Sequence, residues 1–246
     1  MKCLILAAGY ATRLYPLTEN FPKPLLSVGE KTILDWLIDD IEKSGAVDEY
    51  VVISNGKYAH HFEKWAVGKR ENITVVNDGT MTNETRLGAV KDIKFACDKL
   101  NIADDVLVIA GDNLLDFSLV GFIKYATERK SSCTLRYYEP DRKRLLKSGV
   151  VTVDGDGRII KMTEKSENPE THWCTPPFYY YTSRDVALID EAIKDGCGTD
   201  APGSYVAWLA EHSTVYAMEM PGKRYDIGNL ESYEAVKREY RGITVK

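Results

Sequence analysis

Short apolar runs alternate with amphipathic segments along the first half of the chain. Each apolar run ends at glycine or at polar residues, which is typical of strands buried on both faces of a parallel sheet. The segments between them repeat apolar residues every three or four positions, which predicts helices. The expected strands are residues 3–7, 50–54, 73–76 and 106–110, and the expected helices are 32–44, 58–67, 85–100 and 118–126.

The second half is richer in strand-like runs, and Asp154 to Gly157 has the composition of a hairpin turn. Strands that alternate with helices predict right-handed βαβ units. We therefore expect an α/β fold: a Rossmann-like, mostly parallel mixed sheet flanked by helices, within a single domain of residues 1–246. Its strand-rich second half should begin near residue 131. The later strands are expected at 134–138, 150–153, 159–162, 178–181 and 214–218, and the helices at 184–194, 204–211 and 230–240.

Composition narrows the class of protein. The 246 residues are 44% hydrophobic and carry a formal net charge of -5, which disfavours a nucleic-acid-binding module. The five cysteines are scattered and odd in number, as in a cytoplasmic protein with reduced thiols. We expect no signal peptide and no membrane span, because no apolar run approaches the ~20 residues that a bilayer requires.

The loop after the first strand carries the densest candidate chemistry. Small residues from Ala7 to Gly9 allow backbone N–H groups to approach a polyphosphate closely, and Arg13 and Lys23 add positive charge. Either cation alone is also compatible with an ordinary surface position. A dinucleotide-binding GxGxxG motif is excluded because only Gly9 is present, and no GxxxxGK[ST] motif occurs.

Two acidic motifs follow at loop positions. Asp112 stands in Gly111-Asp112-Asn113, directly after an apolar strand, where a carboxylate is well placed to hold Mg²⁺. Asp226 stands in Tyr225-Asp226-Ile227-Gly228. Taken alone, each motif also fits a simple turn or helix cap.

The segment from Leu6 to Leu26 resembles the signature LAAGxGTRLxPLTxxxPKPLLPV of sugar-phosphate nucleotidyltransferases, the family of glucose-1-phosphate thymidylyl- and uridylyltransferases. Ala11 stands where the family has its second glycine. The matching residues are Gly9, Thr12, Arg13, Leu14, Pro16, Leu17, Thr18, Pro22, Lys23, Pro24, Leu25 and Leu26.

The resemblance implies a set of roles and a division into a nucleotide-binding half, about 1–130, and an acceptor-binding half, about 131–246. It implies that Arg13 and Lys23 are catalytic and that Asp112 and Asp226 hold Mg²⁺. The implied acceptor residues are Gly149, Glu164 and Lys165. The implied nucleotide-binding residues are Ala8, Gly9, Thr12, Arg13, Lys23, Asn83, Gly88 and Asp112.

Some positions depart from the family pattern. Ser148 and Ser166 replace a tyrosine and a proline in the acceptor motifs, and residues 78–86 do not match the usual base-reading loop. The nucleobase and the acceptor therefore stay open at the level of sequence.

The resemblance implies transfer of a nucleotidyl group from a nucleoside triphosphate to a sugar 1-phosphate, with release of pyrophosphate. The nearest alternative is a cytidylyltransferase for a non-sugar acceptor, such as phosphocholine or a polyol phosphate. A regulatory subunit that binds nucleotide sugars without turnover is disfavoured, because a binder needs fewer of the charged residues. The expected partners are the two small-molecule substrates, and we allow for a homo-oligomer.

Overall fold

The chain packs into two compact units that interleave along the sequence. The computed structural model describes residues 1–245. The first unit contains Met1–Arg86, Ala110–Gly121 and the residues from Pro221 onward, and the second contains Leu87–Ile109 and Phe122–Met220. The functional division near residue 130 stays a prediction.

A parallel sheet of β1, β4 and β5 forms the centre of the first unit. β4 pairs with β1 on one side and with β5 on the other, so that Ile5 stands opposite Val52 and Val52 opposite Val75. The interior positions of β1 and β4 are buried, as the continuous apolar runs predict, whereas only Val76 is buried in β5, which ends the order of strands. These elements are β1 (Lys2–Leu6), α1 (Ile33–Ile41), β4 (Glu49–Ser54), α2 (Ala59–Ala66) and β5 (Ile73–Asn77).

Local signals fix the ends of α1. Thr32 and Asp35 form a capping box, in which each side chain accepts a hydrogen bond from the backbone N–H of the other. The helix continues as a 3-10 turn, Glu42–Ser44, which ends at Gly45 with a φ of 61°. The expected helix from 32 to 44 is therefore confirmed in position, and both expected end signals act as predicted.

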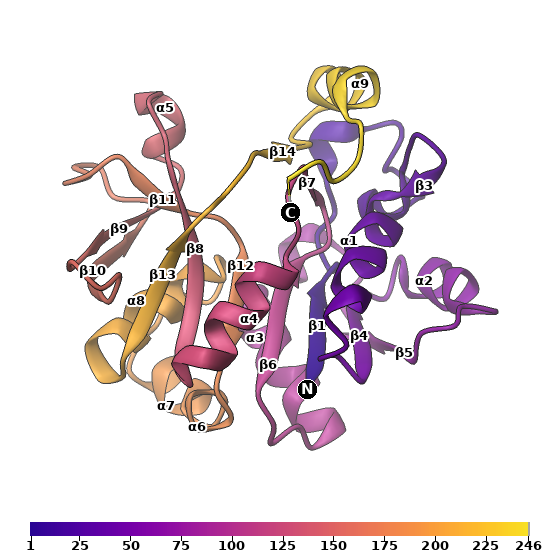
Figure 1. Cartoon of the computed structure of the whole chain (residues 1–246). Helices are drawn as coiled ribbons and strands as arrows, with labels where there is room; N and C mark the ends of the chain where they lie inside the picture. The colour runs from indigo at the N-terminus through magenta and orange to yellow at the C-terminus, as the bar shows by residue number, and fades with distance from the viewer. Residues whose placement is uncertain (246) are drawn as a thin grey trace. The chain divides into compact units, whose positions relative to one another are not determined.

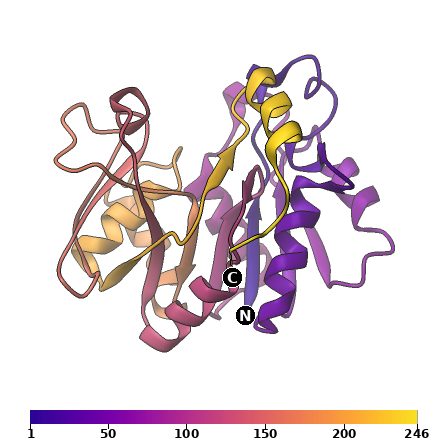
Figure 2. The same cartoon turned by 45° about the horizontal axis from the view of Figure 1, so that its top comes forward.

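Short elements complete the first unit. The C-terminal segment, yellow in Figure 1 and Figure 2, returns to the N-terminal part of the chain, where α9 packs on Leu14, Leu26 and Ile33. The short elements are β2 (Ser27–Val28), β3 (Lys31–Thr32), β7 (Asn113–Leu115), β14 (Arg224–Asp226), α9 (Leu230–Glu239) and the 3-10 turns Thr12–Leu14, Lys23–Leu25 and Asn83–Thr85.

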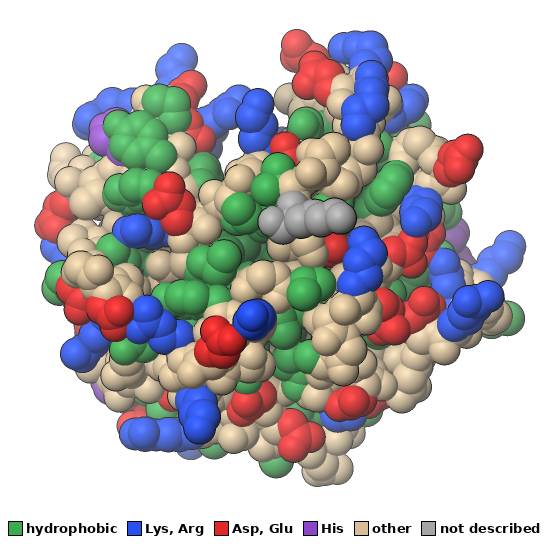
Figure 3. Space-filling view, viewed as in Figure 1, with side chains coloured by type: hydrophobic (Ala, Val, Ile, Leu, Met, Phe, Trp, Pro, Cys, Tyr) green, Lys and Arg blue, Asp and Glu red, His purple; other side chains and the backbone are tan. Residues whose placement is uncertain are grey.

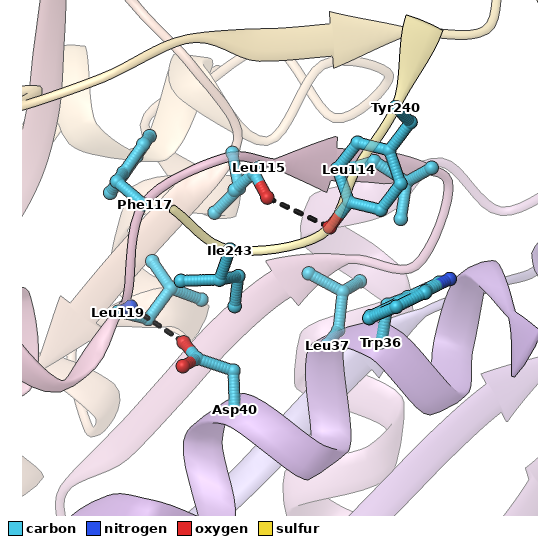
Figure 4. Close-up of a pocket in the computed structure, with 9 residues that line it drawn as sticks. All are labelled: Trp36, Leu37, Asp40, Leu114, Leu115, Phe117, Leu119, Tyr240 and Ile243. Carbon is cyan, nitrogen blue, oxygen red and sulfur yellow. Dashed lines mark hydrogen bonds between the residues drawn. The ribbon is translucent and has the colours of Figure 1, made fainter. Parts of the chain in front are cut away.

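Figure 4 shows how α1, β7 and the C-terminal segment enclose an apolar cavity of about 10 Å³. The buried carboxylate of Asp40 accepts hydrogen bonds from the backbone of Leu119 at 2.7 Å and from Ser118 at 2.9 Å. The Tyr240 hydroxyl donates to the carbonyl of Leu115 at 2.9 Å. A space of this size holds about one water molecule, so the cavity is a packing defect and not a ligand site.

The second unit is built on a mainly antiparallel sheet. β8 lies between β12 and β11, and it also pairs in parallel with β13. Asp154 to Gly157 forms the expected hairpin turn between β9 and β10. The strands are β6 (Val106–Ala110), β8 (Ser132–Tyr138), β9 (Gly149–Val153), β10 (Ile159–Glu164), β11 (Trp173–Thr175), β12 (Phe178–Tyr181) and β13 (Val215–Glu219).

The helices of the second unit differ from expectation at three places, one of which is the short helix Arg142–Leu145, which was not expected. The helix expected from about residue 85 begins only at Ala89, because Gly88 has a φ of 92° that ends the preceding turn. The single helix expected at 184–194 is two, with a turn at Leu188 between them. The helices are α3 (Ala89–Leu100), α4 (Val120–Arg129), α5 (Arg142–Leu145), α6 (Ser183–Val186), α7 (Ile189–Lys194) and α8 (Gly203–His212).

The α/β class and the mixed sheet flanked by helices are confirmed. None of the five cysteines, all within residues 1–245, forms a disulfide, and four of them are buried. Burial raises the pKa of the Cys97 and Cys133 thiols to about 12, so both are inert at neutral pH.

The sequence disfavours a nucleic-acid-binding module and predicts no membrane span, and the surface and the helices concern these two expectations. Basic and acidic side chains are interspersed over the face drawn in Figure 3. None of the helices formed by residues 1–245 is long and apolar enough to cross a lipid bilayer.

Candidate functional site

The loop that leaves β1 is anchored by a buried amide. Asn55, which is fully buried, donates a hydrogen bond from Nδ2 to the carbonyl of Ala8 at 2.9 Å. Its Oδ1 accepts from the backbone of Tyr58 at 3.0 Å, and the Tyr58 hydroxyl donates to the carbonyl of Thr18 at 2.6 Å. Both ends of the signature loop are thereby tied to the segment after β4, while Gly9 and Thr12 stay exposed.

Ala11 is the turning point of the loop. It adopts the left-handed conformation, with φ 46° and ψ 41°, which explains why the signature has glycine at this position. Its carbonyl accepts hydrogen bonds from the backbone of Leu14 at 2.9 Å and from the Thr18 hydroxyl at 2.8 Å. These two bonds hold an alanine in a conformation that costs about 1 kcal/mol.

This strain gives a testable expectation. Ala11→Gly should change the free energy of unfolding by less than about 1 kcal/mol, because relief of strain is offset by the greater freedom of glycine in the unfolded chain. Ala11→Val should lower it by about 1–3 kcal/mol, because a β-branched residue disfavours positive φ. Chemical unfolding measures both. The control is Ala103→Val at an exposed alanine whose φ is not positive; equal stability of the two valine variants would contradict the strain.

Lys23 and Asp112 form an ion pair at the carboxyl end of β6. Lys23 is 6% exposed, and its Nζ lies 2.8 Å from Oδ2 of Asp112. Burial raises the pKa of Asp112, but the charge and hydrogen bond of Lys23 and the charge of Arg224 lower it more, so the net shift is downward. The carboxylate is therefore ionised at neutral pH, and 39% of this side chain stays exposed.

Asn113 extends this pair into a chain of polar contacts. Its Nδ2 donates to Oδ1 of Asp112 at 2.7 Å, and its Oδ1 accepts from Nη1 of Arg224 at 2.7 Å. Asn113 is 2% exposed, so its amide fixes the orientation of both neighbours. We call Lys23, Asp112, Asn113 and Arg224 the polar chain.

Asp226 reaches the same place from the far end of the sequence. β14 pairs antiparallel with β7, and Asp226 stands directly opposite Asn113, one residue from Asp112. Its carboxylate is exposed and has no side-chain partner among residues 1–245. The two acidic motifs singled out in the sequence therefore lie side by side.

Arg13 also lies at this end of the first unit. The side chain is exposed, and Nη1 stands 3.9 Å from the point that a Cβ at Gly228 would occupy, two residues beyond Asp226. The first unit thus brings together the signature loop, Lys23, Asp112 and Asp226, together with Arg13.

The donor set fits a hard divalent cation. Asp112 and Asp226 offer two carboxylates, and Mg²⁺ in proteins commonly takes one or two carboxylates and completes its octahedron with phosphate oxygens and water. Among residues 1–245 no group of three or more histidine, cysteine, aspartate or glutamate side chains is placed to hold an ion. A site built by the protein alone is therefore not present in this part of the chain, and substrate oxygens would have to complete it.

The two residues expected near the base lie in different units. Asn83 begins an exposed 3-10 turn in the first unit. Gly88 lies in the second unit, where a Cβ would stand 2.5 Å from the carbonyl oxygen of Thr199. The N–H groups of Ala89 and Val90 donate to the carbonyls of Asp200 and Thr199, at 3.3 and 3.0 Å, so the start of α3 is already capped by main chain.

Glu164 lies in a cradle of the second unit. Its Oε2 and the hydroxyl of Thr175 each lie 2.7 Å from the point where a Cβ of Gly149 would stand, and the carboxylate also occupies the Cβ position of Gly203. A side chain at either glycine would therefore force the end of the Glu164 side chain to shift. Thr175 is 8% exposed, and its hydroxyl has no partner among residues 1–245.

Burial raises the pKa of Glu164, and the charge of Lys165 offsets only part of this shift. The buried hydroxyl of Thr175 has no partner among residues 1–245, which is unusual for a buried polar group, whereas Glu164 is only partly buried. A buried hydroxyl without a partner among residues 1–245, beside a partly buried carboxylate, fits a binding site for a polar ligand.

Lys165 follows Glu164 in the sequence, and its ammonium lies near Asp200. Its backbone is left-handed, with φ 52°, and its N–H donates to the carbonyl of Ser148 at 3.1 Å. The ammonium is half-exposed and lies 3.7 Å from Oδ2 of Asp200. The three expected acceptor residues therefore gather at one end of β9 and β10.

Four residues of the first-unit site and of the Glu164 cradle were not predicted from the sequence. Arg224 and Asn55 lack any motif, and Thr175 and Gly203 acquire meaning only through the groups that they approach. Asn113 was visible as part of its motif, although its bridging role was not.

The fold and these residues define a class of protein. A family model described as nucleotidyl transferase matches residues 2–242, and the chain belongs to this family. It is 24% identical over 245 residues to the glucose-1-phosphate adenylyltransferase of Fervidobacterium nodosum, with 94% of this chain and 59% of the relative covered. It is 27% identical to the bifunctional protein GlmU of Methanococcus aeolicus, with 93% and 51% covered.

Solved structures agree on the fold. A UDP-glucose pyrophosphorylase complexed with UDP-glucose superposes with a TM-score of 0.82 at 20% identity, covering 97% of each chain. The chain spans only about half to three fifths of the length of the curated relatives named above.

Proposed function

We propose that the protein transfers a nucleotidyl group from a nucleoside triphosphate to a sugar 1-phosphate, releasing pyrophosphate and forming a nucleotide sugar. The observation that carries this proposal is the polar chain with Asp226 beside it. Cations that suit phosphates and carboxylates that suit a divalent cation stand together at the carboxyl end of a strand, where α/β folds bind ligands.

The reaction needs no protein nucleophile. The acceptor phosphate is ionised near neutral pH and attacks the α-phosphorus in line, so catalysis is mostly positioning and charge neutralisation. Lys23 would bind the α-phosphate, Arg13 the departing pyrophosphate and Lys165 the acceptor phosphate. Backbone N–H groups of the loop around Ala8, Gly9 and Thr12 would hold the polyphosphate.

Mg²⁺ is the cofactor we propose, held by Asp112 and Asp226. When bound, it neutralises phosphate oxygens. Lys23 keeps the carboxylate of Asp112 ionised and oriented through the contact at 2.8 Å, while Asn113 orients the other oxygen. Asp226, exposed and without a side-chain partner among residues 1–245, is free to reach a ligand.

The cradle of Glu164 favours a hydroxyl-bearing acceptor. A desolvated carboxylate and an unpaired hydroxyl at one glycine can accept and donate hydrogen bonds to a polyol or sugar. Phosphocholine has no hydroxyl to donate to them. A polyol phosphate stays as the second candidate acceptor.

Substitutions in this cradle test the acceptor class. Glu164→Gln and Thr175→Val should each raise the acceptor KM by about tenfold or more, because one charged or neutral hydrogen bond is lost, and leave the KM for triphosphate unchanged. Glu164→Gln should not lower stability at neutral pH. A raised folded-state pKa means that the neutral form favours folding, and that this benefit is lost as pH rises through the folded pKa.

The matched control is Glu167→Gln, at an exposed glutamate three residues further on. Equal acceptor KM values for Glu164→Gln, Thr175→Val and this control would remove both residues from the acceptor site.

A pyrophosphate-release screen tests the function itself. Each nucleoside triphosphate is combined with sugar 1-phosphates, polyol phosphates and phosphocholine in the presence of Mg²⁺. We expect release only with a sugar 1-phosphate. Release with CTP and a non-sugar phosphate would establish the alternative, and no release with any pair would overturn the enzyme assignment.

A cytoplasmic location is also part of the proposal. Five cysteines without a disulfide among residues 1–245 support a cytoplasmic location, where thiols stay reduced. The proposed partners are the two small-molecule substrates and, if the protein assembles, further copies of the same chain.

A further inference from the structure

The second unit carries a hollow that the proposed chemistry does not use. It has a volume of about 480 Å³, within the range of small-molecule sites, and lies where α4, α6 and α8 end or begin around the start of β13. We call it the basic hollow. Its lining includes Lys130, Arg158, Arg184, Asp185, Glu211 and His212.

Three cations face this hollow without a counter-ion. Lys130, Arg158 and Arg184 are exposed and form no ion pair with any of residues 1–245. The adjacent Arg129, by contrast, is neutralised by Asp156, with Nη1 2.6 Å from Oδ2. Three cations without an ion pair among residues 1–245 therefore lie together around one hollow.

The acidic groups of the hollow do not cancel this charge. Asp185 is 2% exposed, and its carboxylate accepts hydrogen bonds from the hydroxyls of Ser132 and Ser213, at 2.5 and 2.8 Å. Glu211 is the one exposed acid in the lining. Three cations against one exposed carboxylate leave a positive excess.

His212 is fixed in place at the rim. Its Nδ1 contacts the carbonyl of Trp208 at 2.8 Å, and its ring stacks on the Trp208 ring with centroids 3.9 Å apart. The imidazole of His212 is therefore held at the rim, and its resonance can be used to detect binding in the hollow.

The hollow is distinct from the Glu164 cradle. It lies at the Ser132 end of β8, whereas Cys174, next to Thr175, pairs with Tyr137 near the other end of the same strand. The five residue steps from Ser132 to Tyr137 correspond to a separation of about 17 Å. One small ligand does not fill both.

We propose that the basic hollow binds a small multivalent phosphate anion, a compound with two or more phosphate charges, at a second site of the protein. Arg158 and Arg184 present planar guanidinium groups that suit bidentate contact with phosphate oxygens, and Lys130 adds a third charge. The proposal stands on the geometry of the second unit and does not depend on the transfer reaction.

Inorganic pyrophosphate is the probe, followed through the imidazole resonances of the intact protein. The His212 signal should shift and saturate, while that of His172, which contacts the carbonyl of Glu139, should not shift with the same dissociation constant. In the Arg158→Ala/Arg184→Ala variant the dissociation constant at His212 should rise by at least about tenfold, because two charge-assisted hydrogen bonds are lost.

The matched control is Arg142→Ala/Arg144→Ala, which removes two exposed arginines of α5 outside the hollow and should leave the His212 titration unchanged. Melting temperatures confirm that both variants fold, and Arg158→Gln/Arg184→Gln replaces a variant that does not. An unshifted His212, or a titration that is the same in all variants, would overturn the proposal. Binding of pyrophosphate only at the nucleotide loop would also overturn the proposal. In that case the variants of Arg158 and Arg184 would keep the full affinity for pyrophosphate.

Discussion

Replacing Asp226 with asparagine should lower turnover by about 10²-fold or more and leave the melting temperature unchanged. The carboxylate is exposed and has no partner among residues 1–245, so the folded state loses nothing with its charge. The proposed metal site loses one of only two protein ligands, and one well-placed electrostatic contact is typically worth this much in rate. Initial rates of pyrophosphate release at several Mg²⁺ concentrations measure the effect.

Asp112→Asn should behave differently, because Asp112 also neutralises Lys23. Removing that charge leaves a cation that is 6% exposed without its partner, which costs about 1–3 kcal/mol of stability in addition to the loss of rate. Because the pKa of Asp112 is lowered in the folded protein, the direction in which stability changes with pH follows. The stabilisation is present above the unfolded pKa and is lost as pH falls through the folded pKa, so it is fully in place at neutral pH.

The control is Glu231→Gln, an exposed acid in the first turn of α9. It should match the wild type in rate and stability. Full activity in the presence of a chelator would contradict the metal proposal, and an effect of Asp112→Asn alone would reduce it to a single ligand.

Arg13→Ala should lower the rate constant for turnover by about 10²-fold and leave the acceptor KM nearly unchanged. Arg13 is proposed to stabilise charge that develops on the departing pyrophosphate, and such contacts act on the transition state. Lys165→Ala should instead raise the acceptor KM, since Lys165 is proposed to bind the acceptor phosphate. Both side chains are exposed, so neither variant should unfold. Steady-state kinetics with each substrate varied in turn separate the two effects.

Arg238→Ala serves as the charge-matched control, because this exposed arginine of α9 lies outside both proposed sites. Identical kinetic signatures for Arg13→Ala and Lys165→Ala would refute the division of roles. If neither variant differed from Arg238→Ala, both residues would be ordinary surface cations.

Long elements of the fold were predictable from the sequence, whereas the shortest were not. β1, β4 and α1 carry enough apolar residues to show their period. The structure places β1 and β4 within one position of expectation, and α1 reaches the expected end only together with its 3-10 turn. β7 and β14 have three residues each, too few for any period to appear. These two strands bring Asp226 beside Asp112, so the juxtaposition at the site was the part that pattern alone could not show.

The proposed acceptor site shows a second limit of prediction from sequence. Glu164 and Gly149 were found through a motif, but Gly203 and Thr175 belong to no motif and matter only because they approach the same carboxylate. A contact between residues far apart in sequence depends on tertiary packing, and local propensity carries no information about it. The unpaired hydroxyl of Thr175 is visible only in three dimensions.

The interleaving of the first unit has a consequence for biosynthesis. Asn113 and Arg224, which join the two acidic motifs, are 111 residues apart, and the intervening chain forms most of the second unit. A ribosome that adds about 5–20 residues per second must therefore work for several seconds after Asp112 emerges before its neighbour Asp226 exists. During this interval Lys23 is the only charged partner available to Asp112 within the polar chain. The nascent protein thus acquires its proposed metal-binding pair only after most of the second unit has been made.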